Sequence, residues 1–379
     1  MIINTSQQNE NFIDNSDICI VGAGPAGITL AKEISKNESI NISIIESGDL
    51  NFDSKNQKLN SGECLEFGNY PHKNYSVSHA RIRQFGGTSN VWAGWSGPLE
   101  KNDFKERLWI DKSGWPISYQ DLEEHYKKSQ SILNLSEFIY DKTIYDYYPK
   151  SYSNNYLKEF NNVFWQFSKP PVKFNHKYFQ HLKNKKNIKL FLKNTVTDLI
   201  KVENKIVEII SVKNSVKYKF KSKIFVLACG AIENAAILLN FIRKNPKDEF
   251  NNPNVGKYFM EHPHCTIGYG YTKDNSNKFL SCYSKNKIKQ FNNVSFLSGV
   301  VIPDQIQKEN CITNCVSVFL ENNFLEIQSA VILRYNVALK AFNFSFIKFF
   351  IQFLKDIKKI NISFLEILKN SISKKKNFI

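Results

Sequence analysis

One segment, residues 17–46, constrains the fold of this chain more than any other stretch of its sequence. A short apolar run there leads into Gly22, Gly24 and Gly27, which stand at GxGxxG spacing, and a second apolar run ends at Glu46. The order strand, glycine turn, helix, strand and acid is typical of a βαβ unit that binds a dinucleotide. The spacing alone also fits an ordinary glycine turn, but the complete order favours the dinucleotide site, without distinguishing NAD from FAD.

Each of these residues has its own reason in such a unit. Gly22 permits the tight turn, Gly24 carries no side chain that would block a pyrophosphate, and Gly27 lets the helix pack close to the strand. The helix N-terminus directs backbone N–H groups and the positive end of its dipole at the phosphates. We expect the Glu46 carboxylate to bind a hydroxyl of the adenosine ribose.

Composition and charge argue against other classes of protein. The 379 residues are 42% hydrophobic, which is enough for a large core and about two domains. The formal net charge of +16 permits nucleic-acid or membrane-surface binding. The excess is mostly Lys scattered among abundant Asn, Ile and Phe, however, so we favour a compositional bias and expect no nucleic-acid partner.

Cysteine usage and hydropathy favour a cytoplasmic protein. The 7 cysteines include no CxxC pair, so we expect neither a disulfide framework nor a metal site. The N-terminal residues lack the basic and apolar regions of a signal peptide. No apolar run approaches the ~20 residues that a membrane-spanning helix needs.

A second informative segment, residues 81–99, combines glycine with small polar and indole side chains. The residues of interest are Gly86, Gly87, Thr88, Asn90 and Trp92. Such a composition lets the backbone approach a flat ligand, offers hydrogen bonds to its polar edge and supplies an aromatic wall. A glycine turn with buried tryptophans explains the same composition, and the residues alone do not decide between the two.

Alternating apolar residues in the second half of the chain predict a β-meander that contains Val196 and ends in an apolar strand at residues 224–227. Gly230 ends this strand, and a helix opens around Glu233. A strand, a glycine and a helix N-terminus would give a second close approach to a nucleotide. A plain βα turn explains the same residues equally well.

The remaining segments give weaker signals. Ser118, with Asp121 three residues later, is typical of a helix N-cap. His262 and His264 flank a proline, but no third metal ligand accompanies them, and we assign them no catalytic or metal-binding role. Residues 342–360 repeat Phe and Ile at helical spacing between lysines, a pattern that fits a membrane-surface helix but more often packs against its own protein.

Taken together, four motifs resemble the glucose-methanol-choline (GMC) family of FAD-dependent oxidoreductases. They occur in the family's order and cover residues 15 to 268. The motifs are VGAGPAG with Glu46, RIRQFGGTSNVWAGWSGPLEKNDF followed by GWPISYQDLEEHY, FVLACGAIENAAILL, and VGKYFMEHPH.

The resemblance implies an α/β (α+β) fold, with a Rossmann-like FAD-binding domain that carries a β-meander and an incomplete substrate-binding domain with an antiparallel sheet. We expect a disordered leader over residues 1–14 and the FAD-binding domain over residues 15–262, with a cap or lid inserted at residues 101–189. Residues 263–379 would form the partial substrate-binding domain, which ends in a Phe- and Lys-rich helical tail.

The resemblance also assigns roles to residues that match the family's motifs. The cofactor-binding residues it implies are Gly22, Gly24, Gly27, Glu46, Gly86, Gly87, Thr88, Asn90, Trp92, Val196, Gly230 and Glu233. Residues 86–92 would run along the isoalloxazine ring, residues 228–233 would close over the nucleotide, and Val196 would contact the adenine side. Val91 stands where some relatives carry a histidine joined covalently to the flavin, so the resemblance implies non-covalent FAD.

The reaction that the resemblance implies is hydride transfer from the CH–OH carbon of an alcohol or sugar to flavin N5. Members of the family carry their catalytic histidine near the end of a longer chain, whereas the last histidine here is His264, so we identify no catalytic residue. Two alternatives stay open. The first is that the chain is a truncated or split half completed by a second polypeptide. The second is that it is a non-catalytic flavin-binding or membrane-surface protein.

Overall fold

The computed structural model describes most of the first two thirds of the chain and part of the remainder. The described residues are 12–64, 77–78, 80–147, 159–249, 251–260, 283, 289–291 and 294–319. Their contacts divide the chain into two compact units, the first comprising Met1–Gly94 with Pro171–His264 and the second Trp95–Pro170 with Cys265–Ile379.

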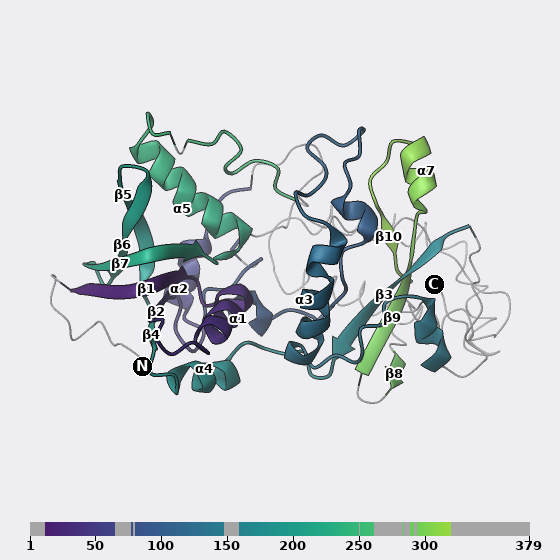
Figure 1. The fold of residues 1–379 in the computed structure, drawn as a ribbon, viewed down its shortest axis with the longest axis horizontal. Helices are drawn as coiled ribbons and strands as arrows, with labels where there is room; N and C mark the ends of the chain where they lie inside the picture. Colours follow the sequence, from purple (N-terminus) through teal and green to yellow (C-terminus); the bar gives the residue numbers. More distant parts are fainter. Residues whose placement is uncertain are drawn as a thin grey trace, which may run out of the picture. The chain divides into compact units, whose positions relative to one another are not determined.

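The first unit is built on a six-stranded mixed sheet with the order β4-β2-β1-β7-β6-β5 (Figure 1). Its strands are β1 (Ile13–Val21), β2 (Ile42–Ile45), β4 (Ile188–Phe191), β5 (Thr195–Val202), β6 (Lys205–Lys213) and β7 (Val216–Leu227). Neighbours β4, β2, β1 and β7 run parallel, whereas β7, β6 and β5 run antiparallel. The predicted α/β fold, in which a parallel half continues into a β-meander, is therefore confirmed.

Two helices of the first unit begin where a parallel strand ends. The glycine turn leads from β1 into α1 (Pro25–Ile34), and α5 (Gly230–Lys244) follows β7 (Figure 1). Pro25 suits the first turn of α1 because the N–H that it lacks would have no intrahelical partner there. Ile28 and Ala31 lie on the buried side of this helix. The shorter helices are α2 (Ser54–Gln57), η2 (Lys58–Asn60), η3 (Gly87–Asn90) and α4 (His176–Lys183).

The core of the first unit joins the parallel strands to the meander. All residues of β2 are buried, as expected for a parallel strand that is covered on both faces. The buried cluster consists of Cys19, Val21, Ile45, Phe191, Ile209, Tyr218 and Phe220. The rings of Phe191 and Phe220 meet edge to face, with centroids 4.8 Å apart. Burying a large side chain of this kind contributes about 1.5–3 kcal/mol, so the cluster fixes the strands whose ends carry the candidate site.

The second unit contains an antiparallel sheet in which β3 and β10 flank β9, and β8 also pairs with β9. Its strands are β3 (Asn161–Ser168), β8 (Lys289–Phe291), β9 (Val294–Val301) and β10 (Val316–Ser317). Its helices are α3 (Tyr119–Ile132), α7 (Asp304–Glu309), η4 (Lys101–Phe104) and η5 (Lys142–Tyr147). Ser118 caps α3 as predicted, because its hydroxyl accepts the Asp121 N–H while Asp121 accepts the Ser118 N–H at 2.7 Å. The second, antiparallel sheet is confirmed as well.

The element boundaries differ from the expected ones in two places. β1 begins at Ile13, inside the segment expected to be a disordered leader, because Ile13 pairs with Lys219 and the buried Asp14 carboxylate binds Lys189 at 2.7 Å. The expected cap at residues 101–189 is divided, because β3 pairs with β9 of the second unit while α4 and β4 belong to the first. The strand β3 was not predicted, since NNVFWQFS lacks a clean alternation of polar and apolar residues.

Several expectations lie outside the described residues. They concern His262, His264 and the Phe- and Lys-rich tail. Within the described ranges, no helix is both long and apolar enough to cross a membrane.

Candidate functional site

Three segments that are far apart in the sequence meet at the carboxyl ends of β1, β2 and β7. The glycine turn after β1 is at their centre, and Gly22 N–H donates to Ile45 O at 2.8 Å. On one side Ala228 N–H donates to Val21 O at 2.7 Å, and on the other Gly86 N–H donates to Ala23 O at 2.7 Å. The structure thus brings the predicted glycine turn, the predicted glycine loop and the predicted βα turn into direct contact.

The fold itself requires glycine at two positions of the turn. Gly22 has a φ of 101°, and a Cβ there would lie 2.7 Å from Ala228 O. A Cβ on Gly27 would lie 2.0 Å from Gly22 O, because α1 passes directly over the turn. Any larger residue at either position forces the backbone to move.

Gly24 differs from both neighbours because the fold gives no reason for a glycine there. Its φ is −81° and its ψ is −177°, which any residue adopts without strain. A Cβ would meet only Ala228 O, at 4.0 Å, which is an ordinary contact distance. Gly24 is also the N-cap residue of α1, and no side chain caps this helix. The position therefore offers backbone N–H groups and open space to a ligand, which fits a dinucleotide pyrophosphate.

The glycine loop is held tightly against the turn. Gly86 has a φ of 91°, and a Cβ there would lie 2.2 Å from Phe174 O. Gly87 has a φ of 55°, and its Cβ would lie 3.1 Å from the Cα of Gly24. Both glycines are required by the backbone conformation and by the close approach of another segment. The loop therefore borders the open space beside Gly24.

The side chains of this loop make contacts within the protein. The Asn90 amide donates to Phe85 O at 3.0 Å and to Gly87 O at 2.9 Å, so it fixes the shape of η3. The Trp92 indole N–H donates to Val172 O at 2.8 Å. Thr88 is exposed. The structure thus places these three predicted residues at the site and shows that Asn90 and Trp92 also stabilise the loop.

Glu46 connects the glycine turn to the loop that follows β2. Its buried carboxylate accepts the Ala23 N–H at 2.8 Å and the Gly48 N–H at 2.6 Å. Burial raises the pKa of Glu46, and the two backbone donors together with the nearby Arg83 guanidinium oppose this shift. Each carboxylate oxygen keeps a second lone pair, so a ribose hydroxyl can still donate to it.

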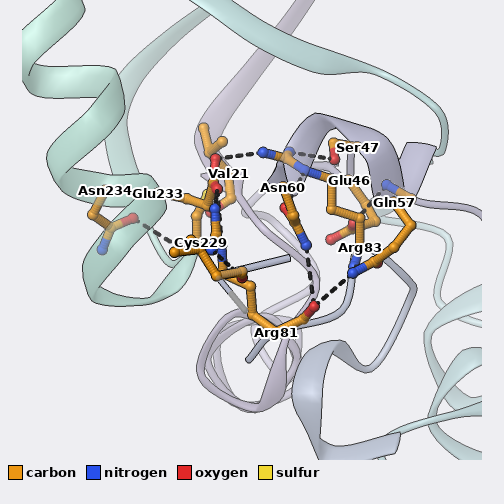
Figure 2. Close-up of polar contacts among 12 residues, drawn as sticks. Val21, Glu46, Ser47, Gln57, Asn60, Arg81, Arg83, Cys229, Glu233 and Asn234 are labelled. Carbon is orange, nitrogen blue, oxygen red and sulfur yellow. Dashed lines mark hydrogen bonds and ion pairs between the residues drawn. The ribbon is translucent and has the colours of Figure 1, made fainter. Parts of the chain in front are cut away.

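Glu233, in the first turn of α5, binds two arginines that sequence reasoning gave no role. The Arg81 guanidinium donates to Oε1 of Glu233 at 2.8 and 3.1 Å, and Arg83 donates to Oε2 at 2.5 Å (Figure 2). Charge-assisted pairs of this kind are the stronger hydrogen bonds of proteins. The available signal was two arginines separated by one residue, the second of them three positions before the glycine pair, but their partner lies about 150 residues away.

The same arginines are part of a wider polar network (Figure 2). Arg83 also donates to Ser47 Oγ at 2.8 Å and to Asn60 Oδ1 at 2.6 Å. The Gln57 amide donates to Arg81 O at 2.8 Å and accepts the Arg83 N–H at 3.1 Å. Side chains from α2, η2, α5 and the residues just after β2 thus fix the segment that leads into the glycine loop.

The βα turn after β7 is also fixed by polar contacts. Gly230 has a φ of 79°, which explains the glycine by backbone conformation alone. The Cys229 thiol donates to Val21 O at 3.1 Å, and Asn234 Oδ1 accepts the Cys229 N–H at 2.9 Å. Burial raises the pKa of Cys229 to about 12, so this thiol is not a nucleophile near neutral pH. Val196 lies at the start of β5 and packs, partly buried, against the core cluster.

No metal site is formed by the described part of the chain, since it brings together no group of three or more His, Cys, Asp or Glu side chains suited to a metal ion. The histidines whose positions are described, His125, His176 and His181, lie on α3 and α4. The described residues thus supply binding groups at the carboxyl edge of the sheet and no histidine among them.

Comparison with known proteins gives distant structural likenesses. No protein-family model matches the sequence, and no curated protein matches it. Pyridoxine 4-oxidase from Mesorbium loti is 17% identical with a TM-score of 0.38 over 59% of this chain and 51% of its own. Formate oxidase from Aspergillus oryzae is 16% identical, with a TM-score of 0.37 over 60% of this chain and 48% of its own. An FAD-dependent oxidoreductase from Chaetomium thermophilum is 13% identical, with a TM-score of 0.39 over 59% of this chain and 47% of its own.

The chain thus spans about half the length of the solved structures that it resembles. TM-scores below 0.4 establish neither a family nor an activity, and we therefore infer function from the residues of the chain itself.

Proposed function

We propose that this chain is an FAD-dependent oxidoreductase of the GMC type, which binds FAD non-covalently and oxidises the CH–OH group of an alcohol or sugar. The observation that carries the proposal is the geometry at Gly24. Gly22 and Gly27 are required by the fold, whereas Gly24 has an ordinary backbone conformation and open space where its Cβ would be. A ligand that lies against the backbone explains a glycine at this position, and an ordinary glycine turn does not.

The surrounding groups suit the two halves of FAD. The uncapped N-terminus of α1 offers backbone donors to the pyrophosphate, and Glu46 offers carboxylate lone pairs to the ribose. Residues 86–92 would run along the isoalloxazine ring, and residues 228–233 would close over the nucleotide. Val196 would contact the adenine side. The motif order of the GMC family, in which these segments occur together, supports the choice of FAD over NAD.

Non-covalent binding is supported by Val91. Its side chain is 59% exposed at the end of η3 and has no nucleophilic atom that could bond to the flavin. The affinity for FAD would then come from backbone donors, hydrogen bonds and apolar contacts alone. The cysteine pattern supports a cytoplasmic location.

FAD, when bound, supplies the acceptor for the hydride that leaves the substrate carbon. The residues described here would bind and orient the cofactor, and a base within hydrogen-bond reach of the substrate hydroxyl would take its proton. We assign no residue to that role, since the described histidines lie on α3 and α4. The same observation favours a second candidate, a flavin-binding part that has no base of its own and is completed by a second polypeptide.

The visible absorption spectrum of the purified full chain distinguishes these candidates. After desalting, retained flavin bands that bleach on anaerobic addition of a primary alcohol or an aldose support the oxidoreductase. Flavin that stays oxidised with every alcohol and aldose supports the part without a base. A colourless protein that takes up no added FAD refutes the FAD proposal in both forms.

A further inference from the structure

We propose that Glu233 is a positioning residue, which holds the glycine loop in place for the cofactor by binding Arg81 and Arg83 together. This inference rests on the proposed FAD site and adds a residue that acts through its neighbours. Glu233 is the only acceptor that both guanidinium groups share among the contacts of the described residues.

The geometry makes Glu233 the connection between two segments. Oε1 accepts from Arg81 and Oε2 accepts from Arg83, so each carboxylate oxygen holds a different arginine. The guanidinium and carboxylate side chains are only 14–20% exposed, which limits screening by water. α5 is thereby tied to the segment that leads into the glycine loop (Figure 2).

Movement of this segment would reach the open space at Gly24 through a short series of backbone contacts. Two residues after Arg83, the Phe85 N–H donates to Asp49 O at 2.9 Å. The next residue, Gly86, donates to Ala23 O at 2.7 Å, and Gly87 lies against Gly24. A displacement of the arginine pair therefore alters the border of the open space at Gly24.

Charge explains why the carboxylate is needed. Arg81 and Arg83 each bring a positive charge to Glu233, which binds both of them. Without its negative charge, two neighbouring guanidinium groups repel each other and lose their shared acceptor. Glu233→Gln keeps the size of the side chain, removes its charge and replaces one acceptor oxygen by an NH2 donor that no arginine can donate to.

The chain offers a matched control in the ion pair of Lys201 with Asp248. Both oxygens of Asp248 accept from Lys201, at 2.7 and 2.8 Å, and the side chains are 12% and 16% exposed. This pair belongs to the same unit and has similar burial, but it joins β5 to the segment after α5 and not to the glycine loop. Asp248→Asn thus reports the general effect of breaking a partly buried ion pair.

The test compares FAD binding by the full-length wild type, Glu233→Gln and Asp248→Asn, measured by titration of flavin fluorescence and by the shape of the bound flavin's visible bands. We expect Glu233→Gln to weaken the Kd for FAD by about tenfold or more and to shift the bands. Asp248→Asn should lower the Tm of the protein without flavin by about as much as Glu233→Gln does. Its Kd for FAD should stay within about twofold of the wild-type value.

A double variant tests whether Glu233 acts through the arginines. Because Arg83→Gln and Glu233→Gln break the same ion pair, the loss of FAD affinity in the double variant should be smaller than the product of the two single losses, even though Arg83 also donates to Ser47 and Asn60. Single losses of FAD affinity that multiply in the double variant would overturn the inference. So would a Glu233→Gln variant with wild-type affinity and spectrum, or an equal loss of FAD affinity in Glu233→Gln and Asp248→Asn. A wild type that binds no FAD refutes the proposed function, and this inference with it.

Discussion

Replacing Gly24 by serine separates a ligand-binding glycine from a structural one. The position has a φ of −81°, and its nearest potential contact, Ala228 O, is 4.0 Å from the Cβ position. Serine is also a better N-cap than glycine and restricts the unfolded chain, so Gly24→Ser should stabilise the protein without flavin by about 0.5–1 kcal/mol. For a unit of this size the corresponding rise in Tm is about 1–4 °C.

The same change should damage FAD binding. The new hydroxyl would occupy the space next to the pyrophosphate and compete for the N–H groups at the start of α1. Forcing extra atoms into a filled space costs about 1–3 kcal/mol, which is an increase in Kd of about 5- to 150-fold. The expected combination is an equal or higher Tm without flavin and a clearly weaker Kd.

Calorimetric scans with and without FAD measure both quantities, because FAD raises the Tm of the folded protein according to its occupancy. Gly27→Ala is the matched control, since its Cβ would lie 2.0 Å from Gly22 O and should lower the Tm even without flavin. If Gly24→Ser binds FAD as tightly as the wild type, the open space at Gly24 does not hold the pyrophosphate. If it unfolds like Gly27→Ala, the structural reasoning about this turn is wrong.

Three further outcomes follow from the described contacts. Burial raises the pKa of Glu46 in the folded protein, so its contribution to stability is present at low pH and is lost as the pH rises through that raised pKa. Chemical denaturation at several pH values should therefore show that the free energy of unfolding of the wild type falls relative to that of Glu46→Gln as the pH rises. The fall should be at most about 1.4 kcal/mol per pH unit. Free energies of unfolding that depend on pH in the same way in both proteins would contradict this. Phe191→Ala should cost about 3–5 kcal/mol in the same assay, since Phe191 is fully buried, and a loss below about 1 kcal/mol would contradict the described core. Partial burial raises the pKa of Cys229 to about 12, so peptide mapping after brief alkylation of the native protein at neutral pH should find Cys229 unmodified and the exposed Cys64 modified. Equal labelling would contradict the raised pKa.

The sequence was sufficient to predict the elements whose signals are local. The glycine spacing with its flanking apolar runs predicted β1, α1 and β2, and Ser118 with Asp121 predicted the start of α3. In both cases neighbouring residues determine the backbone conformation, through steric freedom at glycine and through a reciprocal hydrogen bond at the cap. The meander was predictable for the same reason, since its alternation reflects one buried face.

Features that depend on contacts between distant residues were not predictable. The Arg81–Glu233 and Arg83–Glu233 pairs join segments that are about 150 residues apart, and no local pattern indicates which carboxylate two arginines share. The contacts of Glu46 with two backbone N–H groups of its own protein likewise follow only from the fold. The strand β3 is defined by its pairing with β9, which lies far along the chain.

We propose binding of FAD at the carboxyl edge of the first unit's sheet. A titration of the full-length chain with FAD, followed by flavin fluorescence and repeated with an excess of NAD, tests it most directly. Stoichiometric, saturable quenching that NAD does not reverse is the expected result. Absence of saturable binding, or displacement of FAD by NAD, would contradict the claim.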